Sequence, residues 1–270
     1  MITSSILGLL VGFTLGLTGA GGGILAVPAL VIGVGLSMTS AAPVALIAVG
    51  LAALAGALDG LRRHMVRYKA AIIMALTGGL ISPVGLWLAQ RLPEFWLMTL
   101  FAGVMCVVAY RMFKQVYKRP SQGNSAAPER LKPCMLSGQT GKFIWNPRSL
   151  ATMMGIGAVS GLLTGLLGVG GGFVIVPLLQ RFTNLKMHSI VATSLLVIAL
   201  VSAITVTSAW SSLVNLPLAI WGFVALVITG MGLGRWISPA IAPQYIQMGF
   251  ALVCVFSACI VFVNACKHIV

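Results

Sequence analysis

The sequence carries the stretch GLTGAGGGILAVPAL at residues 16–30 and the related stretch GLLGVGGGFVIVPLL at residues 165–179. Nine of the fifteen aligned positions are identical. The same offset, which takes Gly16 to Gly165, also superposes Trp87 on Trp236. The chain is therefore an internal duplication, and the glycine-rich stretch is its clearest signature.

Each stretch places three consecutive glycines, and a proline five residues later, inside a long apolar segment. An interior glycine costs a helix roughly 1 kcal/mol relative to alanine, and an interior proline removes a backbone donor and clashes with the preceding turn. Within a bilayer, a broken helix is tolerated only where protein or a water-filled cavity covers the freed backbone groups. Interrupted apolar segments at matching positions of two halves therefore point to the binding site of a transporter.

The composition excludes a water-soluble globule. Hydrophobic residues make up 59% of the chain, charged residues only 7%, and the mean hydropathy is +1.05; a soluble protein carries about 25% charged residues. Several apolar runs reach the roughly 20 residues that span a bilayer as a helix, and the Leu, Ala and Met content argues against a barrel. No basic region precedes the first apolar run, so a cleaved signal peptide is not expected. The sequence predicts an all-α polytopic membrane protein.

The net charge of +14 does not indicate nucleic-acid binding. The 17 Lys and Arg residues stand at the ends of apolar runs, as the positive-inside rule predicts for a membrane protein. The five cysteines show neither metal-ligand spacing nor an even disulfide framework. We expect no nucleic-acid partner, no cofactor and no metal, and the lipid bilayer as the surroundings of the chain.

The duplication divides the chain into a first transmembrane repeat at 1–114, a basic cytoplasmic linker at 115–148 and a second repeat at 149–270. Each repeat begins with a broken segment and continues with three helices. The predicted segments are 4–32, 38–60, 69–89 and 94–114 in the first repeat, and 150–180, 187–210, 216–236 and 244–265 in the second.

The charges decide between parallel and inverted repeats. The loop Arg62–Lys69 is strongly basic, whereas its counterpart in the second repeat, Ser211–Asn215, carries no charge. An inverted arrangement with two re-entrant broken helices puts 15 Lys and Arg residues on the cytoplasmic side and two outside, while a parallel arrangement gives 13 and four. The positive-inside rule therefore favours inverted repeats, each beginning with a Gly/Pro-broken, re-entrant helix.

Half-helices that meet at the glycines bring unpaired N–H groups and a positive helix end to the middle of the membrane, where they attract anions. Glycines without a Cβ atom let a small oxyanion approach the main chain closely. Two alternatives stay open: the carbonyl ends of the half-helices suit cations, and the glycines can serve tight helix packing alone. A dinucleotide-binding loop is excluded, because neither a preceding strand nor a ribose-binding acid is present.

Hydroxyl side chains add to the candidate site. Thr193 and Ser194 lie within a spanning run and Thr18 lies beside the glycines, although such hydroxyls also bond back to their own helix. No acid is expected at mid-depth, so a carboxylate proton relay is poorly supported. The candidate substrate-binding residues are Thr18, Gly19, Gly21, Gly22, Gly23, Pro28, Gly168, Gly170, Gly171, Gly172, Pro177, Thr193 and Ser194.

The pattern Gly-x-Gly-Gly-Gly-x-x-x-x-Pro-x-Leu, present at Gly19–Leu30 and Gly168–Leu179, resembles the sulfite exporter TauE/SafE family. The stretch Ala192–Leu195 is also similar to the second-half pattern of that family, whereas the first-half counterpart Pro43–Leu46 lacks the hydroxyls. The resemblance implies transport of small sulfur-containing oxyanions, such as sulfite, sulfonates or sulfoacetate, across the bacterial inner membrane. Members of the family differ in substrate and in direction.

The leading hypothesis is a transporter of small anions that works by export or facilitated exchange. Its rivals are a transporter of a cation or neutral solute, and a membrane assembly factor with no transport of its own. An enzyme is not expected, because no His, Cys or acid cluster has the spacing of a metal site or a nucleophile. Substrate, coupling ion and oligomeric state are left open by the sequence.

Overall fold

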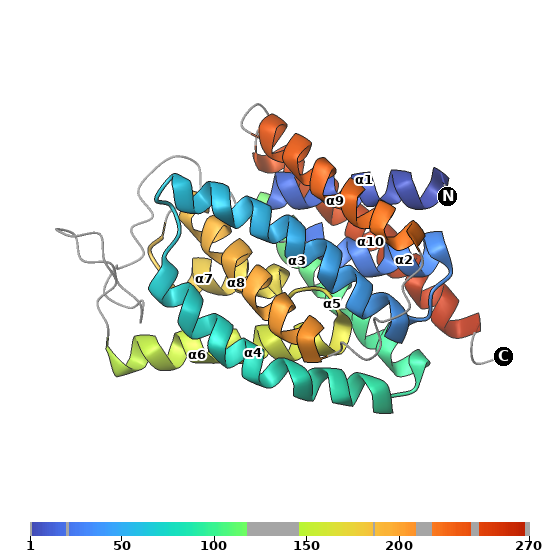
Figure 1. Ribbon diagram of the computed structural model, residues 1–270, viewed down its shortest axis with the longest axis horizontal. Coiled ribbons are helices and arrows are strands. Elements are labelled where there is room, and N and C mark those ends of the chain that lie inside the picture. Colours follow the sequence, from blue (N-terminus) through green and yellow to red (C-terminus); the bar gives the residue numbers. More distant parts are fainter. Residues whose placement is uncertain are drawn as a thin grey trace.

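The computed structural model describes residues 2–19, 22–117, 146–185, 187–208, 218–238 and 243–267. Most of the predicted linker and the loop Ser211–Asn215 lie outside these residues. The described residues form ten α-helices and one short 3-10 helix, η1 (Figure 1). The elements are α1 Ile2–Thr18, η1 Gly22–Leu25, α2 Ala26–Val34, α3 Met38–Arg62, α4 Tyr68–Arg91, α5 Glu94–Tyr117, α6 Pro147–Leu167, α7 Gly172–Phe182, α8 Met187–Ser208, α9 Leu218–Ile237 and α10 Pro243–Lys267.

Seven of the described helices, namely α3 to α6 and α8 to α10, are long and apolar enough to cross a membrane. The predicted all-α class is therefore confirmed. The helices predicted at 38–60, 69–89 and 94–114 appear as α3, α4 and α5, with bounds that agree within three residues. Both glycine-rich stretches interrupt their helices, so that α1 is followed by η1 and α2, and α6 by α7.

Local signals explain where several of these helices begin. The Glu94 carboxylate accepts a hydrogen bond of 2.8 Å from the Met38 N–H, which satisfies one of the unpaired donors at the start of α3. At the start of α6, the side chains of Asn146 and Ser149 form a capping box, with Pro147 in the first turn. Gly35, with φ of 73°, ends α2 in the left-handed conformation that glycine adopts freely.

The first helix of each repeat packs on a helix of the other repeat. Gly12 of α1 lies against the backbone of Val227 in α9, and Gly161 of α6 lies against the backbone of Gly78 in α4. The offset between the repeats maps one of these contacts onto the other, since it takes Gly12 to Gly161 and Gly78 to Val227. The two repeats are thus related by a two-fold pseudo-symmetry. Two further pairs of contacts correspond in the same way. Gly8 contacts Phe223 as Gly157 contacts Met74, and Gly16 contacts Met231 as Gly165 contacts Ser82.

Helices α3 and α8, which are equivalent in the two repeats, pack against each other in opposite directions. Gly50 lies against Ser202 and Gly60 lies against Ala192, so the residue numbers rise along one helix as they fall along the other. Both helices are largely buried. In Figure 1, α1 and α9 lie on one side of this pair and α4 and α6 on the other. In contrast, α1 and α9 run in the same direction, as do α4 and α6.

Basic residues gather at one end of the helix bundle, here called the basic end, where α3 connects to α4. Arg235 of α9 reaches this end and forms an ion pair with Asp59. Both marked termini lie on the other side of the molecule in Figure 1. Arg62, Arg63, Arg67 and Lys69 stand around the connection of α3 to α4, and Arg235 joins them.

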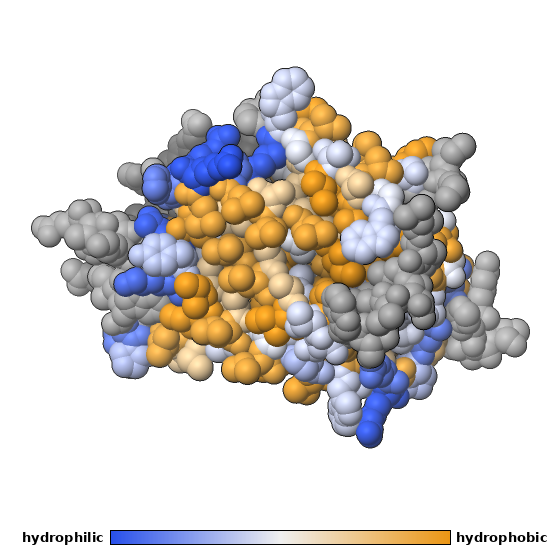
Figure 2. Space-filling model, viewed as in Figure 1, coloured by the Kyte–Doolittle hydropathy of each residue, from blue (hydrophilic) through white to orange (hydrophobic). Residues whose placement is uncertain are grey.

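The surface between the two ends is apolar. Figure 2 shows a broad hydrophobic area across this face, with hydrophilic residues gathered toward its left and lower right margins. Large apolar side chains such as Leu80, Trp236 and Phe256 are mostly exposed, at 78%, 81% and 68%. An apolar belt of this kind fits a lipid environment, in which no free energy is lost by exposing hydrocarbon.

The close contact between α6 and α4 predicts a sharp difference between two glycines of the same helix. A Cβ atom on Gly161 would meet the backbone of Gly78, whereas one on Gly155 meets nothing within 4 Å. We expect Gly161→Ala to lower the free energy of unfolding by about 1–3 kcal/mol through overpacking. Gly155→Ala, the matched control, should leave it unchanged or slightly higher. Thermal unfolding of the purified variants in detergent measures both, and equal midpoints would contradict the backbone contact.

Candidate functional site

The first glycine turn follows α1. Gly19 has φ of 79°, and its N–H donates to the Leu15 carbonyl at 2.8 Å. The Thr18 hydroxyl donates to the Thr14 carbonyl at 2.7 Å and accepts from the Gly22 N–H at 3.0 Å. Thr18 therefore caps the start of η1 and is occupied by the backbone. Gly21, another predicted site residue, lies outside the described residues.

The chain reverses its direction at this turn. Gly22 lies against the backbone of Leu15, and Gly33, near the end of α2, lies against the Leu7 side chain near the start of α1. Helices α1 and α2 thus form an antiparallel hairpin, which brings the chain back toward the end of the bundle from which it came.

The second glycine turn follows α6. Gly168 has φ of 71° and donates its N–H to the Thr164 carbonyl at 2.9 Å, as Gly19 does in the first turn. Gly170 and Gly171 also have positive φ, at 74° and 65°. These values lie in the left-handed region that costs other residues strain. The break predicted at the three glycines is present in the structure, and the backbone conformation explains why glycine stands there.

Helix α7 begins at this turn without a side-chain cap. The N–H groups of Val174 and Ile175 both donate to the Gly171 carbonyl, at 3.1 and 3.2 Å. Within the described part of the chain, the N–H groups of Gly172 and Phe173 have no hydrogen-bond partner. This first turn is buried, so α7 presents free donors and the positive end of its dipole to the interior.

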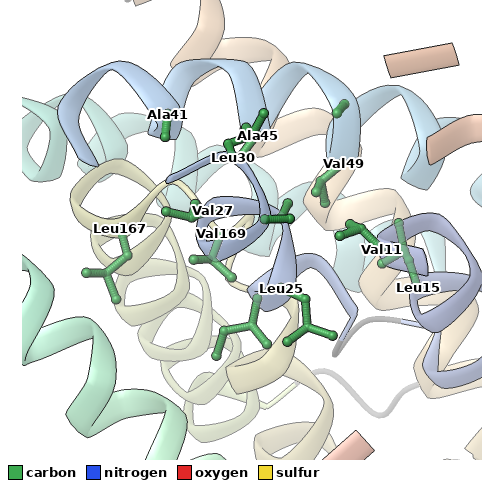
Figure 3. Packing of buried hydrophobic residues seen from close by; sticks show 14 of the residues in the cluster. Val11, Leu15, Leu25, Val27, Leu30, Ala41, Ala45, Val49, Leu167 and Val169 are labelled. Atoms are coloured by element: carbon green, nitrogen blue, oxygen red, sulfur yellow. The ribbon is translucent and has the colours of Figure 1, made fainter. Parts of the chain in front are cut away.

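The two glycine turns meet beside the middle of α3. Gly23 lies against the Val49 side chain and the Val169 carbonyl, and Gly170 lies against Val49 and Ile198. Figure 3 shows Val49 and Val169 in one apolar cluster with residues of η1 and α2. Val49 is near the midpoint of α3, so the turns lie at mid-depth of the bundle.

Two hydroxyl groups beside the second turn were not predicted from the sequence. Ser160 of α6 lies against Gly171, and Ser202 of α8 lies against Gly170. Both side chains are buried, and neither Oγ atom has a hydrogen-bond partner among the described residues. A comparison of the repeats contains the signal that reveals them, because their counterparts in the first repeat are Val11 and Ala53.

The predicted hydroxyls of α8 lie elsewhere. The Thr193 hydroxyl donates to the Ser189 carbonyl at 2.6 Å and accepts from the Arg67 N–H at 3.1 Å, while the Ser194 hydroxyl donates to the Val191 carbonyl. Thr193 precedes Ser202 by nine residues, which corresponds to about 13 Å along a helix. These residues are therefore nearer the basic end than the meeting point of the turns.

The two predicted prolines lie in the helices that follow the glycine turns. Pro28 is buried in α2 and Pro177 is half-buried in α7. Each stands inside its helix and not in the turn itself.

An ion pair joins the repeats at the basic end. Asp59 of α3 accepts from Arg235 at 2.9 Å and from Arg63 at 3.0 Å, and Arg235 also donates to the Gly56 carbonyl at 2.7 Å. The pair is partly exposed, so its contribution to stability is small. Among the described residues, no group of three or more His, Cys, Asp or Glu side chains is placed to hold a metal ion.

Comparison with known proteins places this geometry in a family. The family model described as Sulfite exporter TauE/SafE matches residues 5–261. Two curated relatives, each named probable membrane transporter protein, come from Xylella fastidiosa strains Temecula1 and 9a5c. Each is 30% identical over 233 residues, which cover 83% of this chain and 80% of the relative. No solved structure matches the chain.

The second turn predicts a measurable difference between two left-handed glycines. Gly35 has open space around its missing Cβ atom, whereas a Cβ on Gly168 would meet Ala42. We expect Gly35→Ala to lower the free energy of unfolding by about 1 kcal/mol for the left-handed backbone. Gly168→Ala should lose roughly 1–3 kcal/mol more, through overpacking. Thermal unfolding in detergent gives the comparison, and equal losses would show that Gly168 is not tightly enclosed.

Proposed function

Because the chain belongs to the sulfite exporter TauE/SafE family, we propose that it transports small anions, namely sulfur oxyanions or organosulfonates of the sulfite and sulfoacetate class. The substrate passes through a site between the two repeats, at the meeting point of the glycine turns. The curated relatives are named as membrane transporters, which supports transport in general. The anionic substrate is our inference from the chemistry of the site.

The observation that carries the proposal is the buried start of α7. Free N–H groups and a positive helix end favour a negative charge, and the glycines before them let neighbouring groups such as the Ser160 hydroxyl come close to the main chain. A carboxylate at the same point would favour a cation instead. The two acids within the described part of the chain lie away from it, since Asp59 pairs with arginines at the basic end and Glu94 caps α3.

We further propose that the repeats are inverted across the membrane. The opposite directions of α3 and α8 support this topology, because equivalent helices of parallel repeats would run the same way. The hairpin of α1 and α2 supports a re-entrant broken segment. The first repeat is 1–114, the basic linker 115–148 faces the cytoplasm, and the second repeat is 149–270. The membrane is the inner membrane of a bacterial cell.

Export or facilitated exchange is the direction that the charges support. A negative-inside membrane favours the exit of an anion by roughly 2.3 kcal/mol per charge per 100 mV. No coupling proton is needed for such export. Asp59 pairs with Arg235 and Glu94 accepts from the Met38 N–H, each near a helix end. These positions agree with a transporter that has no carboxylate relay at mid-depth.

Flux measurements test the proposed activity. In liposomes that contain the purified protein, we expect efflux of radiolabelled sulfite above that of protein-free liposomes. The efflux should grow with an inside-negative potential set by potassium and valinomycin, because the substrate carries the charge out. Unlabelled sulfite on the outside should stimulate exchange, whereas a small cation should not compete. Absence of flux for sulfite, sulfate and sulfoacetate alike would overturn the proposal.

Cysteine labelling tests the topology. In a cysteine-free background, we expect His64→Cys, at the basic end, to react with an impermeant maleimide only after the cytoplasmic face is opened. Ser37→Cys, at the opposite end of α3, should react in intact cells. Reporter fusions to the two termini should both report the outside. A cytoplasmic C-terminus would contradict the inverted arrangement.

A further inference from the structure

We propose that the oxyanion binds at the start of α7, to the hydroxyls of Ser160 and Ser202 and to the N–H groups of Gly172 and Phe173. The inference rests on the proposed function and makes it more specific. It assigns the binding groups to the second repeat alone, although both repeats carry the glycine turn.

The first step of the argument is the state of the two hydroxyls. Nine Ser and Thr side chains are buried in the described part of the chain, and Ser160 and Ser202, 0% and 1% exposed, are those without a hydrogen-bond partner. Leaving a hydroxyl buried and unpaired costs free energy. The two unpaired hydroxyls lie at the same place, one beside Gly171 and the other beside Gly170.

The second step is that the surroundings hold these hydroxyls at the turn. Gly50 of α3 lies against the Ser202 Cβ, so the close packing of α3 on α8 fixes the Ser202 side chain beside Gly170. The Thr164 hydroxyl, one turn after Ser160 on α6, donates to the Ser160 carbonyl at 2.7 Å. Thr164 thus has its own partner, and the hydroxyl of Ser160 is left for a ligand.

The third step is the difference between the repeats. In the first turn the Thr18 hydroxyl already accepts from the Gly22 N–H. The positions equivalent to Ser160, Thr164 and Ser202 are Val11, Leu15 and Ala53, which carry no donor. The second turn thus adds side-chain hydroxyls that the first turn lacks to the N–H groups of α7, so its donors come from three elements, α6, α7 and α8.

The donors define the ligand. Backbone N–H groups can only donate, so the ligand must present acceptors on the side facing α7. Two serine hydroxyls and two N–H groups suit a compact anion with several oxygen atoms, as in sulfite or the head of a sulfonate. No arginine or lysine of the described residues shares the site, so the ligand is held by neutral donors. Neutral donors bind an anion more weakly than a salt bridge does, and a transporter must also release its substrate.

The test measures transport kinetics and stability on the same variants. In proteoliposomes, Ser160→Ala and Ser202→Ala should each raise the KM for radiolabelled sulfite about tenfold, as expected for the loss of a hydrogen bond to a charged group. Without sulfite, the thermal midpoint of each variant in detergent should be unchanged or higher, because an unpaired buried hydroxyl has been removed. Sulfite should then raise the midpoint of the variants less than that of the parent protein.

Thr205→Val on the same helix is the matched control. The Thr205 hydroxyl is buried but paired, since its oxygen lies 2.8 Å from both the Ser82 hydroxyl and the Val201 carbonyl oxygen. Its removal should lower the thermal midpoint and leave the KM unchanged. Ser202→Cys, which keeps the shape and a weak donor, replaces the alanine variant if that protein aggregates, and its KM should lie between those of serine and alanine.

The outcomes separate the two proposals. If the parent protein moves no oxyanion, the proposed function fails and this inference fails with it. If the parent transports sulfite and the serine variants keep its KM, the inference alone is overturned. A fall in the thermal midpoint of both serine variants, with no change in KM, would likewise overturn it, because the hydroxyls would then have structural partners.

Discussion

The structure depends on one constraint, that backbone polar groups within a bilayer must be satisfied by the protein itself. Unbroken helices meet it with their own hydrogen bonds, but the two glycine turns cannot. The protein covers both turns with α3 and α8 and brings them together at Val49, away from lipid. At the first turn Thr18 accepts from the Gly22 N–H, whereas at the second turn the buried hydroxyls of Ser160 and Ser202 have no partner among the described residues. The second turn therefore keeps polar groups that a ligand can satisfy.

The glycine faces of α1 and α6 make this covering possible. Lipid tails supply no hydrophobic force between helices, so close packing of backbones must hold them together. Gly12 on Val227 and Gly161 on Gly78 provide that packing at equivalent places. Because each contact joins one repeat to the other, the repeats interlock, and the glycine turns are held against a common core.

Much of this arrangement was predictable, and the reasons for the remainder are physical. The constant offset between the two glycine-rich stretches indicated the duplication, and the hydropathy indicated the helices. The consecutive glycines indicated a break in each helix. At Gly170 and Gly171 the structure shows the reason, because both residues adopt the left-handed backbone.

The positions of the hydroxyls were harder to predict. Thr193 and Ser194 were proposed because they sit in an apolar run, but their hydroxyls bond to backbone groups nearer the basic end. Ser160 and Ser202 stand far apart in the chain, on different helices, and only the packing of α6 and α8 around the turn brings them to it.

The pairing of α1 with α9 also bears on how the protein is made. Gly12 lies against Val227, which the ribosome adds only after most of the chain has been synthesised. At a ribosomal rate of about 5–20 residues per second, the first helix waits roughly ten to forty seconds for its permanent neighbour. Until then the glycine face of α1 contacts either the translocation machinery or lipid. A nascent chain cut before α9 would leave that glycine face without its partner.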